Sequence, residues 1–416
     1  MLSPQRLVSG ESCGSHVVRA GLTKRRPSPT FDALAQSVMQ NHDAECQACA
    51  AWLIEQSREN RLRMKEETMD RKSMSLAFCL AISLCGLVIN RSLVAQENER
   101  DREHNRCHEG QKFSDWSEAV NVGEPINSPD SNYSSWITNN GLSLYITTTR
   151  FSHLDSDGDI AVSQRSRLND PWGEPVRLGP NVNTVGFNEG FPSISEDGLD
   201  LYFQSNRPGG CGAVADLYVS HRPDPTDDFG WQEALNLGCA VNSSDINNGP
   251  DFFQAHGTDY LYYVQTNPPG GIGTLPNIVV SARPTGTGDF AWGSPIPVNE
   301  LNSEYEQGRP SIRRTDGLEM LFTSQRPGFG VRDIWVSTRE SLWSPWSPPV
   351  NLGPTINTQY DDAGQNLDFE GTTLYFWSNR PGGFGVRDLY TSTRCSCEDP
   401  DNDGSDGRRH HSCKEN

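Results

Sequence analysis

The sequence has very little lysine outside its N-terminal part. Only two lysines, Lys112 and Lys414, follow residue 95. Residues 96–416 carry 23 basic against 45 acidic side chains, a net charge of −22, whereas residues 1–95 carry 12 against 9. A surface this acidic repels nucleic acid and tends to attract cations or basic partners. We therefore expect no nucleic-acid partner.

The sequence also lacks a long hydrophobic run. Its longest, residues 74–89 (MSLAFCLAISLCGLVI), has 16 residues, short of the roughly 20 that span a bilayer comfortably. A short basic stretch precedes it, and Ala95 stands before the polar QENER, so residues 74–95 fit a secretory signal peptide. If residues 74–89 were retained, they would anchor the protein in the inner membrane. Both interpretations place residues 96–416 outside the cytoplasm, in the periplasm or at the cell surface.

Glycine and proline, by contrast, are abundant and recur in one pattern. Residues 201–218 read LYFQSNRPGGCGAVADLY, residues 374–390 read LYFWSNRPGGFGVRDLY, and residues 320–335 read MLFTSQRPGFGVRDIW. Looser copies occupy residues 262–279 and 144–161. Each copy is an alternating apolar run, a Gly/Pro turn and a second apolar run that usually begins with Asp. This pattern predicts two strands joined by a tight turn.

A segment built around a tryptophan accompanies each copy. The tryptophans stand 56, 59, 61 and 54 residues apart, and they are Trp116, Trp172, Trp231, Trp292 and Trp346. Self-similarity at such a period marks a repeat architecture, whose units bury their apolar faces by stacking on their neighbours. Four short antiparallel strands per unit point to a β-propeller.

Counting the strands gives the number of blades. We name them a to d from the channel outward: a precedes the hairpin, b and c form it, and d follows the Trp. In sequence order a lone d comes first, then a–b–c–d four times, then a final a–b–c. We therefore expect an all-β, five-bladed propeller over residues 113–394, in which the first d strand completes the last blade. Residues 96–112 form a linker and residues 395–416 an acidic Cys/Asp/His tail. We expect a monomer.

The repeat resembles the WD40-like β-propeller repeat of TolB-type exported bacterial proteins, on the motifs quoted above. The resemblance implies a platform that binds a protein or polysaccharide ligand on the top face of the ring, where the b–c turns lie. A few propeller relatives are polysaccharide lyases or glycosidases, so an enzyme of that kind is the alternative.

Several acids stand just before or at the start of strand a and are expected around the channel mouth: Asp130, Glu189, Glu306, Asp361 and Asp362. As one patch they would bind a cation or a basic side chain, and in a glycosidase two of them would supply acid and base. The sequence has no nucleophile elbow, phosphate loop or metalloprotease motif. We therefore expect a binding platform without catalytic residues.

The b–c turns predict ion pairs and a disulfide. The arginine of Arg-Pro-Gly recurs with the Asp that opens strand c, which predicts the pairs Arg207–Asp216, Arg326–Asp333 and Arg380–Asp388. Six cysteines follow residue 96, an even number that suits an oxidising compartment. Their places on the strands predict a Cys211–Cys239 disulfide and a second one between Cys107 and either Cys395 or Cys397.

No cofactor is required by these patterns, but three stretches have metal-ligand spacing. Calcium is possible at Asp155, Asp157 and Asp159, or at Asp399, Asp401 and Asp403, where the tail resembles a thrombospondin type 3 repeat.

The third stretch lies in the Arg-rich residues 1–73. His42, Cys46 and Cys49 have the spacing of three zinc ligands. They resemble the zinc-binding motif of membrane-tethered anti-sigma factors, which implies a further alternative, a zinc-containing sensor with an extracytoplasmic propeller. Met64, Met69 and Met74 are also possible starts, so zinc is expected only if residues 1–73 are translated.

Overall fold

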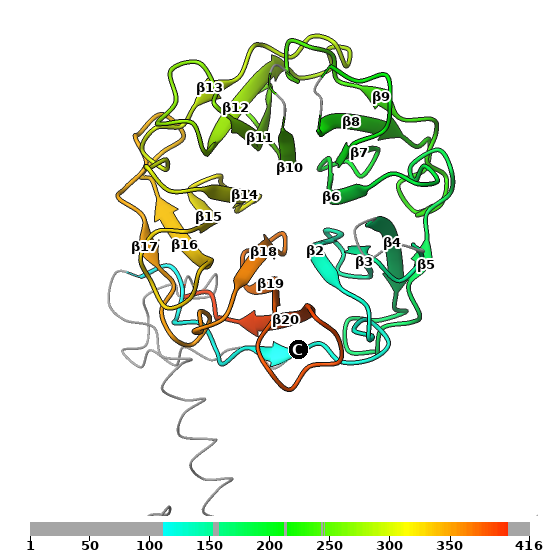
Figure 1. Ribbon diagram of the computed structural model, residues 1–416, viewed down its shortest axis with the longest axis vertical. Coiled ribbons are helices and arrows are strands. Elements are labelled where there is room, and N and C mark those ends of the chain that lie inside the picture. The colour runs from blue at the N-terminus through cyan, green and yellow to red at the C-terminus, as the bar shows by residue number, and fades with distance from the viewer. Residues whose placement is uncertain (1–110, 153–157, 212–213, 243, 245, 398–416) are drawn as a thin grey trace, which may run out of the picture. The chain divides into compact units, whose positions relative to one another are not determined.

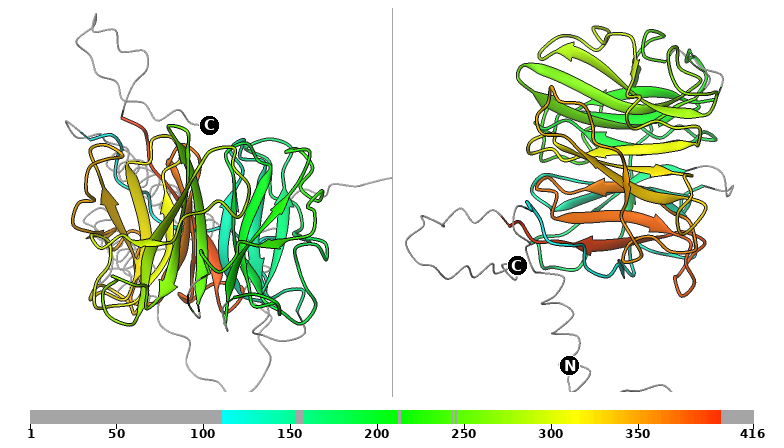
Figure 2. Two further views of the ribbon diagram at one scale, coloured as in Figure 1. Left: turned by 90° about the horizontal axis from the view of Figure 1, so that it is seen from above. Right: turned by 90° about the vertical axis from the view of Figure 1, so that its left-hand side faces the viewer.

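The described part of the protein is a closed ring of five four-stranded antiparallel sheets (Figure 1). The computed structural model describes residues 111–152, 158–211, 214–242, 244 and 246–397. Figure 2 shows the ring from the side, with the strands running between its two faces. The predicted five-bladed propeller is confirmed. No helix that could cross a membrane occurs within the described ranges.

The strands follow the expected order in every blade. From the centre outward, blades one to three are β2 (Asn132–Ile137), β3 (Ser143–Thr148), β4 (Asp159–Gln164), β5 (Val176–Arg177); β6 (Glu189–Ile194), β7 (Asp200–Ser205), β8 (Asp216–His221), β9 (Leu235–Asn236); and β10 (Asn247–Ala255), β11 (Thr258–Thr266), β12 (Pro276–Pro284), β13 (Ile296–Pro297). Blades four and five are β14 (Gln307–Ile312), β15 (Glu319–Ser324), β16 (Asp333–Thr338), β17 (Val350–Asn351); and β18 (Asp362–Leu367), β19 (Thr373–Ser378), β20 (Asp388–Thr393), β1 (Val120–Asn121).

Blade five is closed by the N-terminal strand, as the strand count predicts. Val120 of β1 pairs with Thr391 of β20, and Asn121 pairs with Tyr390, in antiparallel register. The backbone of Ser117 donates to Thr393 at 2.8 Å, which carries the pairing beyond the strand. The ring therefore has no open radial seam.

Each outer strand has only two residues in ladder register, and a buried asparagine after it extends the sheet. The side chain of Asn127 accepts from the backbone N–H of Leu389 and donates to its carbonyl, both at 2.8 Å. Four other blades repeat this two-way contact, in the pairs Asn183–Ile160, Asn242–Leu217, Asn302–Ile278 and Asn357–Ile334. The amide acts as an additional peptide group of strand d.

An arginine at or just after the end of strand c stacks on the tryptophan of strand d in all five blades. The distances from the guanidinium carbon to the ring centre are 4.2–4.4 Å, in the pairs Arg165–Trp172, Arg222–Trp231, Arg283–Trp292, Arg339–Trp346 and Arg394–Trp116. The fifth pair joins the two ends of the domain. Cation–π contacts of this kind contribute about 0.5–2 kcal/mol each.

The core lies between neighbouring blades. One cluster combines Tyr202 and Leu217 of blade two with Phe252, Tyr263 and Trp292 of blade three. The ring of Tyr202 stacks on that of Phe252 with centroids 5.3 Å apart. The recurring aromatics of strand b are therefore core residues, as their alternation with polar residues predicts.

Deleting residues 113–122 should open blade five, because the deletion removes β1 and Trp116 together. We expect soluble aggregates and a lower melting temperature, since β20 would present an unpaired edge. Light scattering after size exclusion measures the first, and calorimetry the second. The variant Trp116→Ala, which keeps the backbone pairing, should stay monomeric but lose about 3–5 kcal/mol of unfolding free energy. A monomeric deletion variant with unchanged melting would contradict the closure.

A charged histidine joins blades two and three on the face opposite the b–c turns. His221 Nδ1 lies 2.7 Å from Asp200 of its own blade, and Nε2 lies 3.0 Å from Asp289 of blade three. These two hydrogen bonds raise the pKa of His221 to about 10, against the opposing effect of partial burial.

The sign of this shift gives a pH dependence. Because the folded pKa exceeds the unfolded value of about 6.5, the contribution to stability is complete below pH 6.5 and is lost as the pH rises through about 10. The variant His221→Gln should therefore melt below the parent at pH 6 and approach it above pH 10. His256→Gln, at an exposed histidine, is the control. A melting difference that stays constant from pH 6 to pH 10.5 would rule out this clamp.

Candidate ligand-binding cavity at the channel mouth

The five acids expected at the mouth fall into two groups. Glu189 and Asp362, the first residues of β6 and β18, are fully buried. Glu189 accepts from the backbone of Thr184 at 2.9 Å and from Ser205 at 2.6 Å. Burial raises the pKa of Glu189, and these hydrogen bonds oppose the rise. Both acids anchor the start of strand a, so they are not available to a ligand.

The arginines of the b–c turns pair with these buried acids, which corrects the predicted pairing. Arg207 contacts Glu189 at 3.2 Å, and Arg380 contacts Asp362 at 2.6 Å. In blade four, Gln307 replaces the acid and lies 3.1 Å from Arg326. The predicted ion pairs with Asp216, Asp333 and Asp388 do not describe these turns.

The aspartates that open strand c instead hold the turn backbone. Asp388 accepts from the N–H groups of Phe384 and Gly385 at 2.5 and 3.0 Å. Asp333 accepts from the equivalent pair in blade four at 2.6 and 3.0 Å, and Asp216 accepts from Cys211. The arginine and the aspartate thus have different partners because each turn must satisfy converging N–H groups, which only an acceptor can do.

The other three acids are partly exposed. Glu306 and Asp361 flank one cation: Arg332 lies 3.8 Å from Glu306 and 3.4 Å from Asp361. Asp130 lies within hydrogen-bonding distance of Ser128, at 3.2 Å. Of these three acids, Glu306 alone lines the cavity described next.

A cavity of about 260 Å³ opens at the channel mouth and is lined by residues of all five blades. Its charged lining residues are three arginines and one acid, namely Arg309, Arg332, Arg387 and Glu306. Its aromatic lining residues are Tyr133, Phe191 and Trp377. The expected patch of acids is therefore replaced by a basic, aromatic cavity, although residues 96–416 carry a net charge of −22.

Arg387 is the cation of this cavity without an acidic partner within the described residues. Its guanidinium lies between the rings of Tyr133 and Trp377, 4.8 and 5.1 Å from their centres. Arg332, in contrast, is balanced by Glu306 and Asp361. The two aromatic rings orient the guanidinium and leave its positive charge uncompensated.

A buried ion cluster closes the channel below the cavity. Arg309, 2% exposed, donates to the carbonyls of Ser135 at 3.0 Å and Pro192 at 2.7 Å, across the ring. Asp251, 1% exposed, accepts from the backbone of Ile312 at 2.7 Å. Burial raises the pKa of Asp251 to about 6, and the nearby Arg309 and Arg314 oppose the rise. This carboxylate is closed to any substrate.

Bulges in the inner strands shape the mouth. All five pairings of strands a and b break register near the start of strand a. At the bulge of β6, Phe191 adopts a φ of 55°, which is uncommon for a residue other than glycine. At the bulge of β10, Gly249 has a φ of 60°, and an added Cβ would lie 3.1 Å from the Cα of Arg309. A side chain there would displace the arginine that closes the channel.

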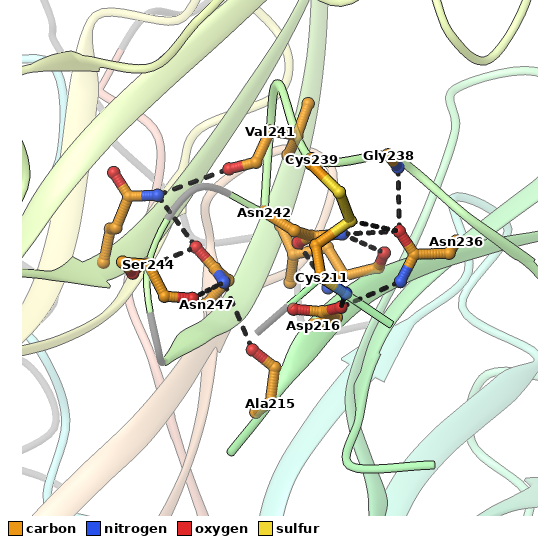
Figure 3. Close-up of a disulfide and its surroundings, with 12 residues drawn as sticks. Cys211, Ala215, Asp216, Asn236, Gly238, Cys239, Val241, Asn242, Ser244 and Asn247 are labelled. Carbon is orange, nitrogen blue, oxygen red and sulfur yellow. Dashed lines mark hydrogen bonds between the residues drawn. A yellow bond between two sulfur atoms is a disulfide. The ribbon is translucent and has the colours of Figure 1, made fainter. Parts of the chain in front are cut away.

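The predicted Cys211–Cys239 disulfide is confirmed (Figure 3), with Cα atoms 5.3 Å apart. It links the b–c turn of blade two to the segment after β9. Cys395 and Cys397 are disulfide-bonded as well. Cys107 lies outside the described residues, so its pairing stays a prediction.

The expected metal sites lie mostly outside the described residues. These are His42, Cys46, Cys49, Asp155, Asp157, Asp399, Asp401 and Asp403. Asp159 is described, and it pairs with Arg177 at 2.7 Å. Within the described ranges no group of three His, Cys, Asp or Glu side chains could hold a metal ion. The calcium and zinc sites stay predictions.

No family model and no curated protein matches the sequence. Among solved structures, the catalytic domain of the Coprinopsis cinerea GH62 α-L-arabinofuranosidase is 12% identical, covers 68% of this protein and 97% of its own length, and has a TM-score of 0.43. An α-L-arabinofuranosidase of Podospora anserina in complex with cellotriose is 11% identical, with coverages of 68% and 97% and a TM-score of 0.44. A Bacillus subtilis arabinanase is 14% identical, with coverages of 65% and 96% and a TM-score of 0.43.

At these values the likeness carries no assignment of activity or substrate, and the propeller fold rests on the strand order of this protein. The solved structures named here are glycoside hydrolases and not TolB-type proteins. Kinship with TolB-type proteins therefore stays a prediction.

Replacing Asp251 by Asn should strongly destabilise the fold, because Arg309 and Arg314 would keep their buried charges without an anion. We expect a loss of about 3–5 kcal/mol of unfolding free energy, measured by denaturant titration. The control Asp130→Asn, at a partly exposed acid, should change it by less than about 0.5 kcal/mol. Equal, small effects of the two variants would show that the cluster does not hold the inner strands.

Proposed function

We propose that this protein is an exported propeller that binds an acidic group of a protein or glycan ligand in the channel mouth, without catalysing a reaction. The observation that supports this most directly is Arg387, a cation in the cavity with no acidic partner in the described part of the protein. A guanidinium offers a carboxylate two parallel N–H donors, and its flanking rings fix the direction of that fork.

The cavity suits one small group rather than a whole polymer. Its 260 Å³ lies slightly below the roughly 300–1,000 Å³ of sites that enclose drug-sized ligands. The ion cluster of Arg309 and Asp251 forms its closed end, so a polymer cannot thread through the ring there. A bound polymer would insert one acidic group and lie across the top face.

The second candidate is a polysaccharide lyase or glycosidase, and Glu306 and Asp361 favour it. They are two carboxylates at the mouth on either side of Arg332, where acid and base would be needed. Acid and base, however, require unlike surroundings, and these two share one cation. Asp251, the carboxylate deepest in the channel, is closed to solvent. The binding platform therefore agrees better with the geometry.

Export and the zinc-sensor alternative depend on residues 1–95, which the structure does not describe. They remain predictions, and the mature N-terminus, determined by mass spectrometry, would test both.

Arg387→Gln should weaken binding of acidic probes at least tenfold, because it removes the uncompensated charge and one arm of the fork. Calorimetric titration of the full-length protein with oligogalacturonate and with a peptide carrying one Asp measures this. Neutral arabinan oligosaccharides and the matching Asn peptide provide the comparison. Arg167→Gln, the same charge change at an exposed arginine of blade one between strands c and d, is the control.

Two results would contradict the proposal. One is equal affinity of parent and Arg387→Gln for every acidic probe. The other is turnover of arabinan or pectin that a single Glu306→Gln or Asp361→Asn change abolishes, which would establish the hydrolase or lyase instead.

A further inference from the structure

Exposed apolar side chains surround the cavity at repeat-equivalent positions. Each stands two residues before the first residue of strand c, or one residue before it in blade three, in four of the five blades. The exposed fractions are 53, 42, 66 and 67% for Val214, Leu275, Val331 and Val386. We name these four residues the apolar collar. The fifth equivalent position, residue 157, lies outside the described residues.

The collar borders the cavity because of its place in the turns. The residue that follows each collar residue lines the cavity in blades three, four and five: Pro276, Arg332 and Arg387. In blades four and five the same turns also expose Phe329 and Phe384, each 47% exposed. The cations of the mouth and the apolar side chains around it are thus supplied by the same short turns.

These turns are held firmly, so the apolar side chains are kept at the surface. Asp333 and Asp388 bind the turn backbone, as described above. Gly330 and Gly385 pack on the next blade, because an added Cβ would clash with the carbonyl oxygen of Tyr360 and with that of Asp130. The collar is therefore a preformed surface, which lowers the entropy cost of binding a partner.

We propose that the ligand of the mouth is a polypeptide segment that places a carboxylate on Arg387 and apolar side chains on the collar. This inference rests on the proposed function, because the same cavity takes the acidic group. Valine and leucine side chains offer a sugar neither hydrogen-bonding groups nor a flat ring to stack on. They do offer apolar area to a peptide, at about 25 cal/mol for each Å² buried. The carboxylate belongs either to an Asp or Glu side chain or to the C-terminus of the ligand.

An array of synthetic heptapeptides, probed with the full-length protein, tests the inference. One set has a central Asp with Leu, Val or Phe on both sides, a second has the same Asp with Ser on both sides, and a third has Asn in place of Asp. A fourth set ends in a free carboxylate after apolar residues. We expect the tightest binding in the first or the fourth set, which distinguishes the two sources of the carboxylate. The Asn set should bind at least tenfold more weakly.

A double variant separates the collar from the cavity. Val331→Ser with Val386→Ser should weaken binding of the apolar-flanked peptides at least tenfold and leave the Ser-flanked Asp peptides and oligogalacturonate within twofold. The matched control is Val120→Ser with Val350→Ser, because these valines are 62 and 61% exposed on the outer strands, away from the mouth. It should leave all affinities unchanged.

The possible failures are distinguishable. Equal binding of apolar-flanked and Ser-flanked peptides, or oligogalacturonate as the tightest probe with no effect of the collar variant, would overturn the peptide inference and leave the acid-binding cavity in place. No response of any probe to Arg387→Gln would overturn both.

Discussion

The stack of an arginine on a tryptophan holds each blade together. Strand d has only two residues in ladder register, too few to stay on the sheet by backbone pairing alone. The stacked pair, at 4.2–4.4 Å in every blade, attaches the start of strand d to the end of strand c. The buried asparagine attaches its far end through two hydrogen bonds. In blade five these contacts join residues from the two ends of the domain, so ring closure uses the same chemistry as each blade.

Much of this fold could be predicted from the sequence, because the repeat fixes strand number, order and closure. The arginine–tryptophan stack was missed although its signal is present: arginines stand seven or nine residues before Trp172, Trp231, Trp292 and Trp346. The wrong partners of Arg207 and Arg380 have another cause. Each arginine lies near two acids in three dimensions, and the choice depends on which acid must also accept the turn N–H groups, which spacing does not reveal.

The cavity could not be found by following the repeat, because it lies where the repeat breaks. Glu189 and Asp362 share their position with Asn132, Asn247 and Gln307, and this shared position is a structural anchor. The position at the end of the b–c turn has instead a different residue in most blades: Gly158, Ala215, Pro276, Arg332 and Arg387. Fivefold equivalence therefore marks the scaffold, and departure from it marks the candidate site.

The charge around the mouth favours ligands with an isolated acid. Surface charges are screened beyond about 8 Å at physiological salt, so the acidic shell acts on a ligand only near contact. A polyanion would bring further charges close to Glu306, Asp361 and Asp130, and each such approach is unfavourable. A single carboxylate flanked by apolar groups meets only Arg387 and the collar. Repulsion at the rim and attraction in the cavity thus select the same chemistry, one acid in an apolar context.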